Sequence, residues 1–345
     1  MYSQGIWTSL QQQDLIRRSI RSFFDQRGCL EVQTPHLVTC PGTEEHLDYF
    51  ASSWEDHLGH IHPLWLRSSP ELHMKQILAV AQQSIYQIAP CYRNKGELSA
   101  EHLPEFNMLE WYELGSKLSD LIETTVSLLR HIHIDWCQYY PAPDWGFAQV
   151  TSMTVAEAFE RFAGICLVDQ DPDLANKARE QGVFSVAGTD DFETAFYKIF
   201  IERVEPALAN FDCAVLYGYP ASQAILARVE EGVAQRFELY IRGIEMCNGF
   251  YELLEEQSNR ERIQAALAAR QKSGKELPHE DEDFYRALRQ GIPECAGNAL
   301  GVDRLHGLLA RRKLADCIPF ARRIPFGHHL TSYVEPQETS SKWLP

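Results

Sequence analysis

The segment 236–252 constrains the fold most, because two runs of strand-forming residues flank the pair Arg242-Gly243. If that pair forms a two-residue turn, the segment is an antiparallel hairpin in which Tyr240 lies opposite Glu245. Elsewhere strand-like and helix-like runs alternate irregularly, without the β-α-β rhythm of a parallel sheet. The sequence therefore predicts a sheet built mainly from antiparallel strands.

Hydrophobic patterns place the other elements. Runs 84–92 and 105–114 are rich in Ile, Tyr, Phe and Trp, and they predict two antiparallel strands joined by a long polar loop. Shorter strands are expected at 29–32 and 212–219. Helices are predicted at 9–27, from Ser69-Pro70 onward, at 117–136, 154–163, 172–181, 190–209 and 258–272, and after Gly301. We therefore expect an α+β fold, in which helices flank a mostly antiparallel sheet.

The chain has 345 residues, of which 45% are hydrophobic, so it can bury a large core. No internal repeat or low-complexity tract divides it. We expect a single domain over residues 1–330, with a helical insertion at about 140–210, and a C-terminal tail at 331–345. Within the insertion, Thr154 and Glu157 have the spacing of a capping box, which marks the start of a helix.

Composition excludes several classes of protein. The net charge is −16, from 48 acidic and 32 basic residues, and a polyanionic surface disfavours nucleic acid as a partner. Nine scattered cysteines without a C-x-x-C spacing indicate reduced thiols. His57, His60 and His62 are predicted to lie in a loop, so no histidine metal cluster is expected. No signal peptide or run of roughly 18 apolar residues is present, so we expect a cytoplasmic protein without a membrane partner.

The hairpin carries candidate metal ligands. Glu238 and Glu245 are expected to share one face of the sheet, where two like charges repel and need a compensating cation. Oxygen ligands favour Mg²⁺, which would also hold the phosphates of a nucleotide. Asn248 and Glu252 follow a break at Gly249 that could turn them into the same cavity. Spacing alone leaves a second interpretation equally open, namely a solvated outer face of the strand.

Two arginines are candidates for phosphate binding. Arg93 leaves a predicted strand into a loop, and Arg304 follows closely after Gly301; a guanidinium group suits phosphate oxygens. Taken singly, each arginine is more often part of a surface ion pair. Phe106 and Tyr112 share one strand face, where they could contact a base and a substrate or simply pack in the core. Because G-x-x-x-x-G-K-[ST], strand-borne G-x-G-x-x-G and G-x-S-x-G motifs are absent, Walker, Rossmann and serine-hydrolase sites are not supported.

Taken together and in order, these segments resemble the catalytic domain of class II lysyl-tRNA synthetases. The segment 23–35, which contains a helix end, a short strand and Pro35, is similar to the first class II motif, which forms the dimer interface in that family. The segments 92–110 and 297–305 are similar to the second and third motifs. Segments 69–75 and 243–253 resemble lysine-specific members, and the similarity covers about residues 10–325.

The resemblance leaves no room for an N-terminal anticodon-binding domain. A catalytic domain without that domain resembles the elongation factor P lysine ligases, which use ATP to activate (R)-β-lysine as its adenylate and transfer it to a lysine of elongation factor P. The resemblance thus implies an AMP-forming ligase that acts as a homodimer and does not bind tRNA stably. Two alternatives stay open: an enzyme that charges tRNA or another acceptor with lysine, and a non-catalytic regulatory protein that binds ATP and lysine.

The resemblance also implies roles for individual residues. Arg93 would hold the α-phosphate and Arg304 the terminal phosphate, both as catalytic groups, while Glu238 and Glu245 would hold Mg²⁺ with ATP. Phe106 would stack against adenine. The implied ATP site contains Arg93, Asn94, Lys95, His102, Leu103, Phe106, Glu245, Met246, Gly301 and Arg304. The implied amino-acid pocket contains Ser69, Pro70, Glu71, Tyr112, Asn248, Glu252 and Ala299.

The chain departs from the family pattern in the loop of the second motif. Lys95 stands where the family has glutamate, Leu103 stands where it has asparagine, and the loop is one residue longer. Glu97 is a candidate for the missing carboxylate. Ala299 stands where lysyl-tRNA synthetases have glycine and the ligases have alanine, which favours β-lysine over α-lysine, because one methyl group can reshape a pocket.

Overall fold

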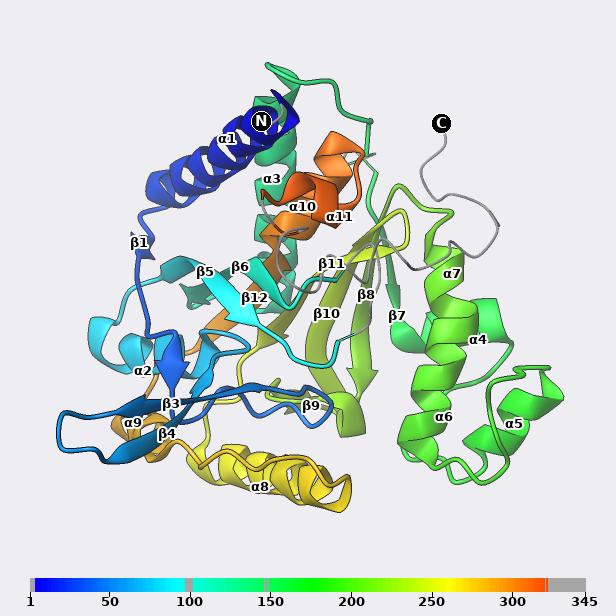
Figure 1. Ribbon diagram of the computed structural model, residues 1–345. Coiled ribbons are helices and arrows are strands. Elements are labelled where there is room, and N and C mark those ends of the chain that lie inside the picture. The colour runs from blue at the N-terminus through cyan, green and yellow to red at the C-terminus, as the bar shows by residue number, and fades with distance from the viewer. Residues whose placement is uncertain (1–3, 97–101, 146, 148, 320, 322–345) are drawn as a thin grey trace.

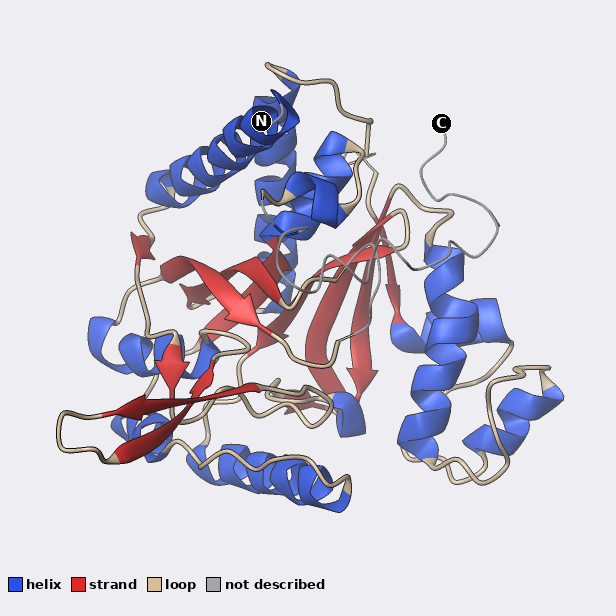
Figure 2. Cartoon of the chain, viewed as in Figure 1, coloured by secondary structure: helices blue, strands red, loops and turns tan. Residues whose placement is uncertain are grey.

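The computed structural model describes residues 4–96, 102–145, 147, 149–319 and 321 (Figure 1). Its centre is a nine-stranded sheet, drawn as red arrows in Figure 2. Along the sheet the strands are β1 (Leu30–Glu31), β5 (Ile85–Tyr92), β6 (Glu105–Leu114), β12 (Cys295–Gly301), β11 (Ile244–Tyr251), β10 (Val233–Ile241), β8 (Cys213–Pro220) and β7 (Thr151–Thr154), while β9 (Val229–Glu230) pairs with β10.

Most neighbouring strands of this sheet are antiparallel, as predicted. Both predicted antiparallel pairs are present, β5 with β6 and β10 with β11, and Tyr240 lies opposite Glu245. Parallel pairing occurs only near the ends of the described sheet, between β1 and β5 and between β7 and β8. The protein thus has the α+β architecture expected from the sequence.

Helices surround the sheet. They are α1 (Gln4–Gln26), α2 (Glu71–Ala81), α3 (Leu118–Cys137), α4 (Val155–Ala163), α5 (Leu174–Glu180), α6 (Phe192–Ile199), the π-helix η1 (Phe200–Val204), α7 (Glu205–Leu208), the 3₁₀ turn η2 (Ala221–Gln223), α8 (Glu256–Lys272), α9 (Glu282–Gln290), α10 (Val302–Ala310) and α11 (Leu314–Cys317). Figure 1 shows α1, α3 and α10 together at the top, α2, α8 and α9 below, and α4–α7 beside β7 and β8. No described helix is long and apolar enough to span a lipid bilayer.

The main hydrophobic core lies between the upper helices and the sheet. Ile16, Ile20 and Phe24 follow helical spacing on α1, and Phe24 stacks on Tyr86 of β5 with ring centroids 4.7 Å apart. After α1 the chain turns at Gly28, whose φ of +70° favours glycine. This core fixes one face of the sheet, so the opposite side of β6, β11 and β12 is available for a site.

Helices α4–α7 build a second apolar cluster that also includes residues of β8 and β10. The predicted capping box is present: Thr154 Oγ1 accepts a hydrogen bond from the Glu157 amide, and the Glu157 carboxylate accepts one from the Thr154 amide. That a single domain covers 1–330 with an insertion at about 140–210 stays a prediction. The predicted tail at 331–345 lies outside the described residues.

The predicted loop contains His57 and His60, which lie between β3 and β4, but the prediction was wrong for His62. A second, three-stranded sheet contains β2 (Leu37–Val38), β4 (Ile61–Leu66) and β3 (Phe50–Glu55), and His62 lies in β4 opposite Trp54. Most side chains of β3 and β4 are exposed on both faces. Because neither face is buried, the hairpin lacks the alternation of polar and apolar residues that reveals a strand.

Candidate active site

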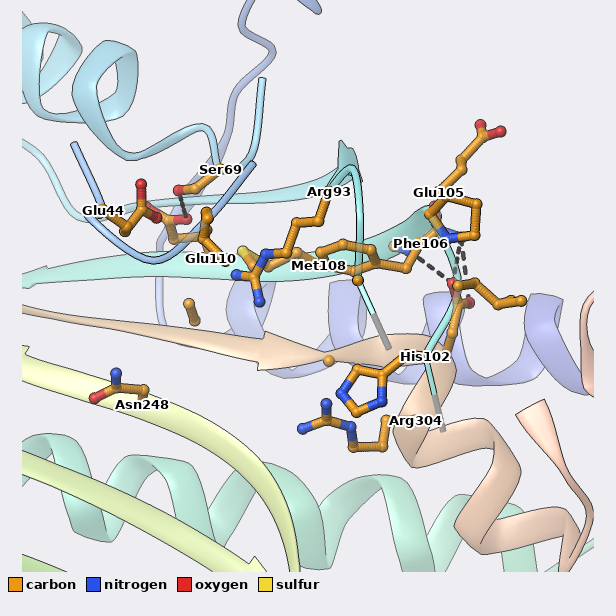
Figure 3. A pocket seen from close by; sticks show the side chains of 18 of the residues that line it. Glu44, Ser69, Arg93, His102, Glu105, Phe106, Met108, Glu110, Asn248 and Arg304 are labelled. Atoms are coloured by element: carbon orange, nitrogen blue, oxygen red, sulfur yellow. Dashed lines mark hydrogen bonds between the residues drawn. The ribbon is translucent and has the colours of Figure 1, made fainter. Parts of the chain in front are cut away.

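A cavity of about 1000 Å³ lies over β6, β11 and β12, beside the start of α10 and beneath the loop that precedes β3 (Figure 3). The structure brings together all the predicted site residues except Pro70 and Glu238. Those lining the cavity are Ser69, Glu71, Arg93, Asn94, Lys95, His102, Leu103, Phe106, Tyr112, Glu245, Met246, Asn248, Glu252, Ala299, Gly301 and Arg304. Pro70 instead precedes the first residue of α2.

Arg93 extends into the cavity from the end of β5. Its guanidinium carbon lies 5.2 Å from the centroid of the Phe106 ring, and its Nε atom is buried without a hydrogen-bond partner among the described residues. A buried, unpaired nitrogen of a charged group is costly unless an anion satisfies it. This end of the cavity therefore fits a phosphate group next to an aromatic ring on which a base can stack.

Arg304 approaches the same end from α10. It donates a hydrogen bond to the backbone carbonyl of Glu245, which ties α10 to β11. The neighbouring Asp303 accepts hydrogen bonds from the amide of Asn107 at 2.7 Å and from its side chain at 3.1 Å. Because these contacts attach α10 to both β6 and β11, the position of Arg304 is fixed by the sheet.

The two predicted magnesium ligands are placed differently. Glu245 lines the cavity, and burial raises the pKa of its carboxyl group, as does the nearby Glu238, while Arg304 opposes the rise. Glu238 does not line the cavity; its carboxylate accepts hydrogen bonds from Arg236 and Tyr240. A bulge between Leu239 and Tyr240 shifts the register, which the sequence did not reveal. Glu245 is thus the carboxylate best placed to share a cation with nucleotide phosphates.

Lys95 forms an ion pair at the mouth of the cavity. Its Nζ atom lies 3.3 Å from the Asp48 carboxylate, and the backbone amide of Asn94 donates to the backbone carbonyl of Asp48 at 2.8 Å. Lys275, which follows α8, lies 3.3 Å from the same carboxylate. Asp48 thus anchors the beginning of the loop in which this chain departs from the family pattern. Glu97, the candidate replacement carboxylate, lies outside the described residues.

The opposite end of the cavity contains a buried carboxylate that the sequence analysis did not assign. Glu110 of β6 accepts hydrogen bonds from Ser69 Oγ at 2.8 Å and from Tyr112 Oη at 2.6 Å. Burial and, to a smaller extent, the neighbouring Glu71 together raise the pKa of Glu110 to about 8. Glu110 alternates with Phe106 and Tyr112 along β6, so its place on the same strand face could have been inferred from the sequence.

A buried lysine neutralises two other carboxylates at this end. Lys75 has no exposed surface, and its Nζ atom lies 2.7 Å from Glu71 and 2.6 Å from Glu252. Burial lowers the pKa of Lys75, but the two carboxylates outweigh that effect and hold it above the usual range. Burial raises the pKa of Glu252 to about 7, whereas Lys75 opposes the rise. Lys75 follows Glu71 by four residues, so their pairing on α2 could have been inferred.

Gly297 separates these groups on the floor of the cavity. A Cβ atom at this position would lie 2.5 Å from Cδ1 of Tyr112 and 2.6 Å from Oε1 of Glu252, closer than real contacts allow. We expect Gly297→Ala to destabilise the protein by about 1–3 kcal/mol, because Tyr112 and Glu252 must move to make room for the methyl group. Thermal unfolding of the two proteins measures this. An unchanged melting temperature would contradict it.

The fold and this cavity define a class II aminoacyl-tRNA synthetase catalytic domain. The family model for class II tRNA synthetases of the D, K and N type matches residues 3–324. Proteins named elongation factor P–(R)-beta-lysine ligase are similar to the chain. The one from Haemophilus influenzae is 37% identical over 309 residues, which cover 88% of this chain and 91% of that protein. The one from Mannheimia succiniciproducens is 38% identical over 295 residues, with 84% and 87% covered. The chain therefore belongs to the elongation factor P–(R)-beta-lysine ligase family.

Proposed function

We propose that the protein uses ATP to activate (R)-β-lysine as its adenylate and transfers the acyl group to a lysine side chain of elongation factor P. The observation that carries this proposal is one continuous cavity with two chemically different ends. Arg93 and Phe106 provide the nucleotide end, and Glu71, Glu110 and Glu252 provide an acidic end suited to a substrate with ammonium groups. The names of the related ligases support the choice of substrate and acceptor.

The proposed first step requires positioning and charge neutralisation. A carboxylate oxygen of the amino acid forms a bond to the α-phosphorus of ATP while the bond to the bridging oxygen breaks and pyrophosphate leaves. Arg93 would stabilise the charge that develops on the α-phosphate, and Arg304 the charge on the leaving group. A Mg²⁺ ion held at Glu245, with Glu238 as a second candidate ligand, would neutralise further phosphate charge. The attacking carboxylate is already ionised, so no protein base is required.

In the second step the amine of the acceptor lysine would form a bond to the acyl carbon of the adenylate. The bond from that carbon to the phosphate oxygen breaks, AMP leaves, and the amine loses a proton. Ser69, Tyr112, Asn248 and Ala299 would line the space around the acyl chain, together with the acidic residues. Pro70 would act indirectly, by fixing the start of α2.

The proposal includes a homodimer. Large hydrophobic side chains are exposed in and after α1, in the segment that contains the motif resembling a class II dimer interface. Trp7 is 58% exposed, Leu30 48% and Leu37 46%. A second copy of the chain that covered these residues would remove apolar surface from water.

A mass-shift assay tests the proposed function. The protein is incubated with ATP, (R)-β-lysine and unmodified elongation factor P, and the mass of the factor should increase by one lysyl group. A parallel reaction contains uncharged tRNA as the acceptor. Charged tRNA without modified elongation factor P would support the alternative of a tRNA-charging enzyme. Binding of ATP without either product would support a regulatory protein.

Amino-acid binding should depend on pH. With pKa values of about 8 and about 7, Glu110 and Glu252 are partly protonated in the empty cavity near neutrality. A substrate ammonium group favours their ionised forms, so binding releases protons, and affinity rises as the pH rises through these values. We expect the KM for (R)-β-lysine to fall at least about threefold between pH 6 and pH 8. A KM that rises over this range would contradict the prediction.

A further inference from the structure

Glu44 is an acidic residue of the cavity that has no role in the activity described above. It lies in the loop between β2 and β3, and its carboxylate Oε2 atom is 3.3 Å from Tyr49 Oη and 3.5 Å from Ser68 Oγ. A Cβ atom on Gly42 would collide with this carboxylate and lie 2.5 Å from Ser68 Oγ. Because glycine has no side chain, position 42 leaves room for the Glu44 carboxylate to point into the cavity.

The charges at the acidic end do not balance. Four carboxylates line it, those of Glu44, Glu71, Glu110 and Glu252. Lys75 forms ion pairs with Glu71 and Glu252, whereas in the described part of the chain Glu44 and Glu110 form none. Enclosed carboxylates without a cation tend to become protonated, and a ligand with positive charge favours their ionised forms. A diamino acid supplies two ammonium groups, one for each of these carboxylates.

The order of groups along the cavity indicates which ammonium group belongs to Glu44. Phe106 and Arg93 mark the nucleotide end, and Glu110 lies four residues farther along β6, or roughly 13 Å. Figure 3 shows Glu44, Ser69 and Glu110 together at the end of the cavity away from Arg304. Burial raises the pKa of Glu44, and Arg93 is the cation that most opposes this rise. At the acidic end of the cavity, Arg93 lowers the pKa of Glu44, whereas Lys75 lowers the pKa values of Glu110 and Glu252.

We propose that Glu44 binds the ammonium group nearer to the substrate carboxylate and thereby selects amino acids that carry an amine at that position. This inference rests on the proposed function, in which Arg93 holds the α-phosphate that the substrate carboxylate attacks. An amine one or two carbons from that carboxylate lies close to Arg93, whereas the terminal amine extends toward Glu110 and Lys75. Glu44 is thus a binding residue that discriminates between diamino acids and ω-amino acids.

The test compares two ligands that differ only in this amine. (R)-β-lysine is 3,6-diaminohexanoic acid, and 6-aminohexanoic acid lacks the amine near the carboxylate. Calorimetric titration in the presence of a non-hydrolysable ATP analogue measures both affinities without turnover. We expect Glu44→Gln to weaken (R)-β-lysine binding about 10- to 100-fold, because a buried charge pair loses one partner. The affinity for 6-aminohexanoic acid should change less than threefold.

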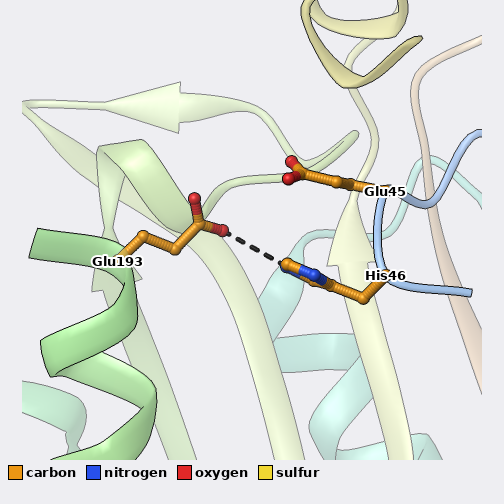
Figure 4. Close-up of side chains that lie close together, drawn as sticks. All are labelled: Glu45, His46 and Glu193. Atoms are coloured by element: carbon orange, nitrogen blue, oxygen red, sulfur yellow. Dashed lines mark hydrogen bonds and ion pairs between the residues drawn. The ribbon is translucent and has the colours of Figure 1, made fainter. Parts of the chain in front are cut away.

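Glu45 provides the matched control. It neighbours Glu44 in sequence but does not line the cavity; its carboxylate lies with His46 and Glu193 in a cluster whose ligand atoms are within 4.8 Å of one another (Figure 4). A nitrogen of the His46 ring lies 3.4 Å from the Glu193 carboxylate, and both side chains are partly exposed to solvent. Glu45→Gln should leave both affinities unchanged. A loss of (R)-β-lysine affinity as large as that in Glu44→Gln would overturn the proposal.

Other outcomes separate this inference from the proposed function. Equal losses for both ligands, or no loss in Glu44→Gln, would overturn the role of Glu44 while leaving the mass-shift assay to decide the activity. If Glu44→Gln does not fold, Glu44→Asp decides instead: the shorter carboxylate should weaken binding of (R)-β-lysine alone. Failure of the unaltered protein to bind (R)-β-lysine would overturn both proposals. Failure of the mass shift with intact, Glu44-dependent binding would overturn only the proposed transfer.

Discussion

Replacing Arg93 by alanine should lower kcat for amino-acid-dependent pyrophosphate exchange by about three orders of magnitude. A positioned cation at the site where charge develops typically contributes this much to acyl or phosphoryl transfer. The buried Nε atom of Arg93 has no partner among the described residues, so the group is oriented without being neutralised. Arg93 also lowers the pKa values of Glu44 and Glu245, which burial raises, and its loss would favour their protonated forms. Steady-state pyrophosphate exchange at saturating concentrations of both substrates measures the change in kcat.

Two further variants make this test specific. Arg242→Ala removes an exposed arginine at the turn between β10 and β11, where it forms an ion pair with Asp212 at 3.1 Å, and it should leave the rate unchanged. Arg93→Lys keeps the charge but loses the planar fork, so its rate should lie between those of the other two variants. An Arg93→Ala rate within tenfold of the unaltered protein would remove Arg93 from the reaction.

The sequence predicted those elements whose signal is local. In the hairpin 236–252 the turn residues and the flanking strand formers are adjacent, and both the turn and the Tyr240–Glu245 pairing are present. The Thr154–Glu157 capping box was predictable for the same reason, because all its partners lie within four residues. Helix α9 was missed although Asp281 caps it and Phe284, Tyr285 and Leu288 are buried at helical spacing, so there the signal was present.

Long-range features of the site were less accessible. Nothing in the pair Glu44-Glu45 shows that the first carboxylate enters a cavity and the second lies outside it, because that depends on Gly42, Ser68 and Tyr49 meeting in space. The spacing of Glu238 and Glu245 predicted a shared face, and Tyr240, which lies opposite Glu245, donates a hydrogen bond to Glu238 on that face. The spacing could not show that Arg236 also pairs with Glu238. Of the site residues named from family resemblance, all but Pro70 and Glu238 line the cavity, since motifs retain their order even where geometry cannot be derived.

The chain's own departures from the family are therefore the most informative positions. Lys95 replaces an acidic residue of the pattern, and the structure provides Asp48 as its partner at 3.3 Å. An exposed ion pair of this kind contributes little stability on its own. Its effect is positional: it adds to the Asn94–Asp48 backbone hydrogen bond and holds the start of the loop close to the segment that carries Glu44. The ion pair therefore links the loop at the nucleotide end of the cavity to the segment that carries Glu44 at the acidic end.

Replacing Glu252 by alanine should abolish amino-acid-dependent pyrophosphate exchange while ATP still binds. Without Glu252, buried Lys75 has only Glu71 as a partner, at 2.7 Å, and its charge remains in the space that a substrate ammonium group must enter. Repulsion between the two cations and the loss of a carboxylate act in the same direction, so we expect the KM for (R)-β-lysine to rise at least about 100-fold. Exchange kinetics and calorimetric binding of ATP measure the two effects separately.

Stability must be controlled in this variant, because removing one partner of a buried ion pair costs about 3–5 kcal/mol. Glu252→Gln keeps the shape of the side chain and a hydrogen-bond acceptor for Lys75, so it should melt at a higher temperature than Glu252→Ala yet still lose amino-acid-dependent exchange. Glu294→Ala removes an exposed carboxylate that pairs with Arg228 at 3.2 Å, outside the cavity, and should retain full exchange. If Glu252→Gln folds, binds ATP and exchanges pyrophosphate with an unchanged KM, Glu252 does not contact the substrate, and the acidic end of the cavity has another purpose.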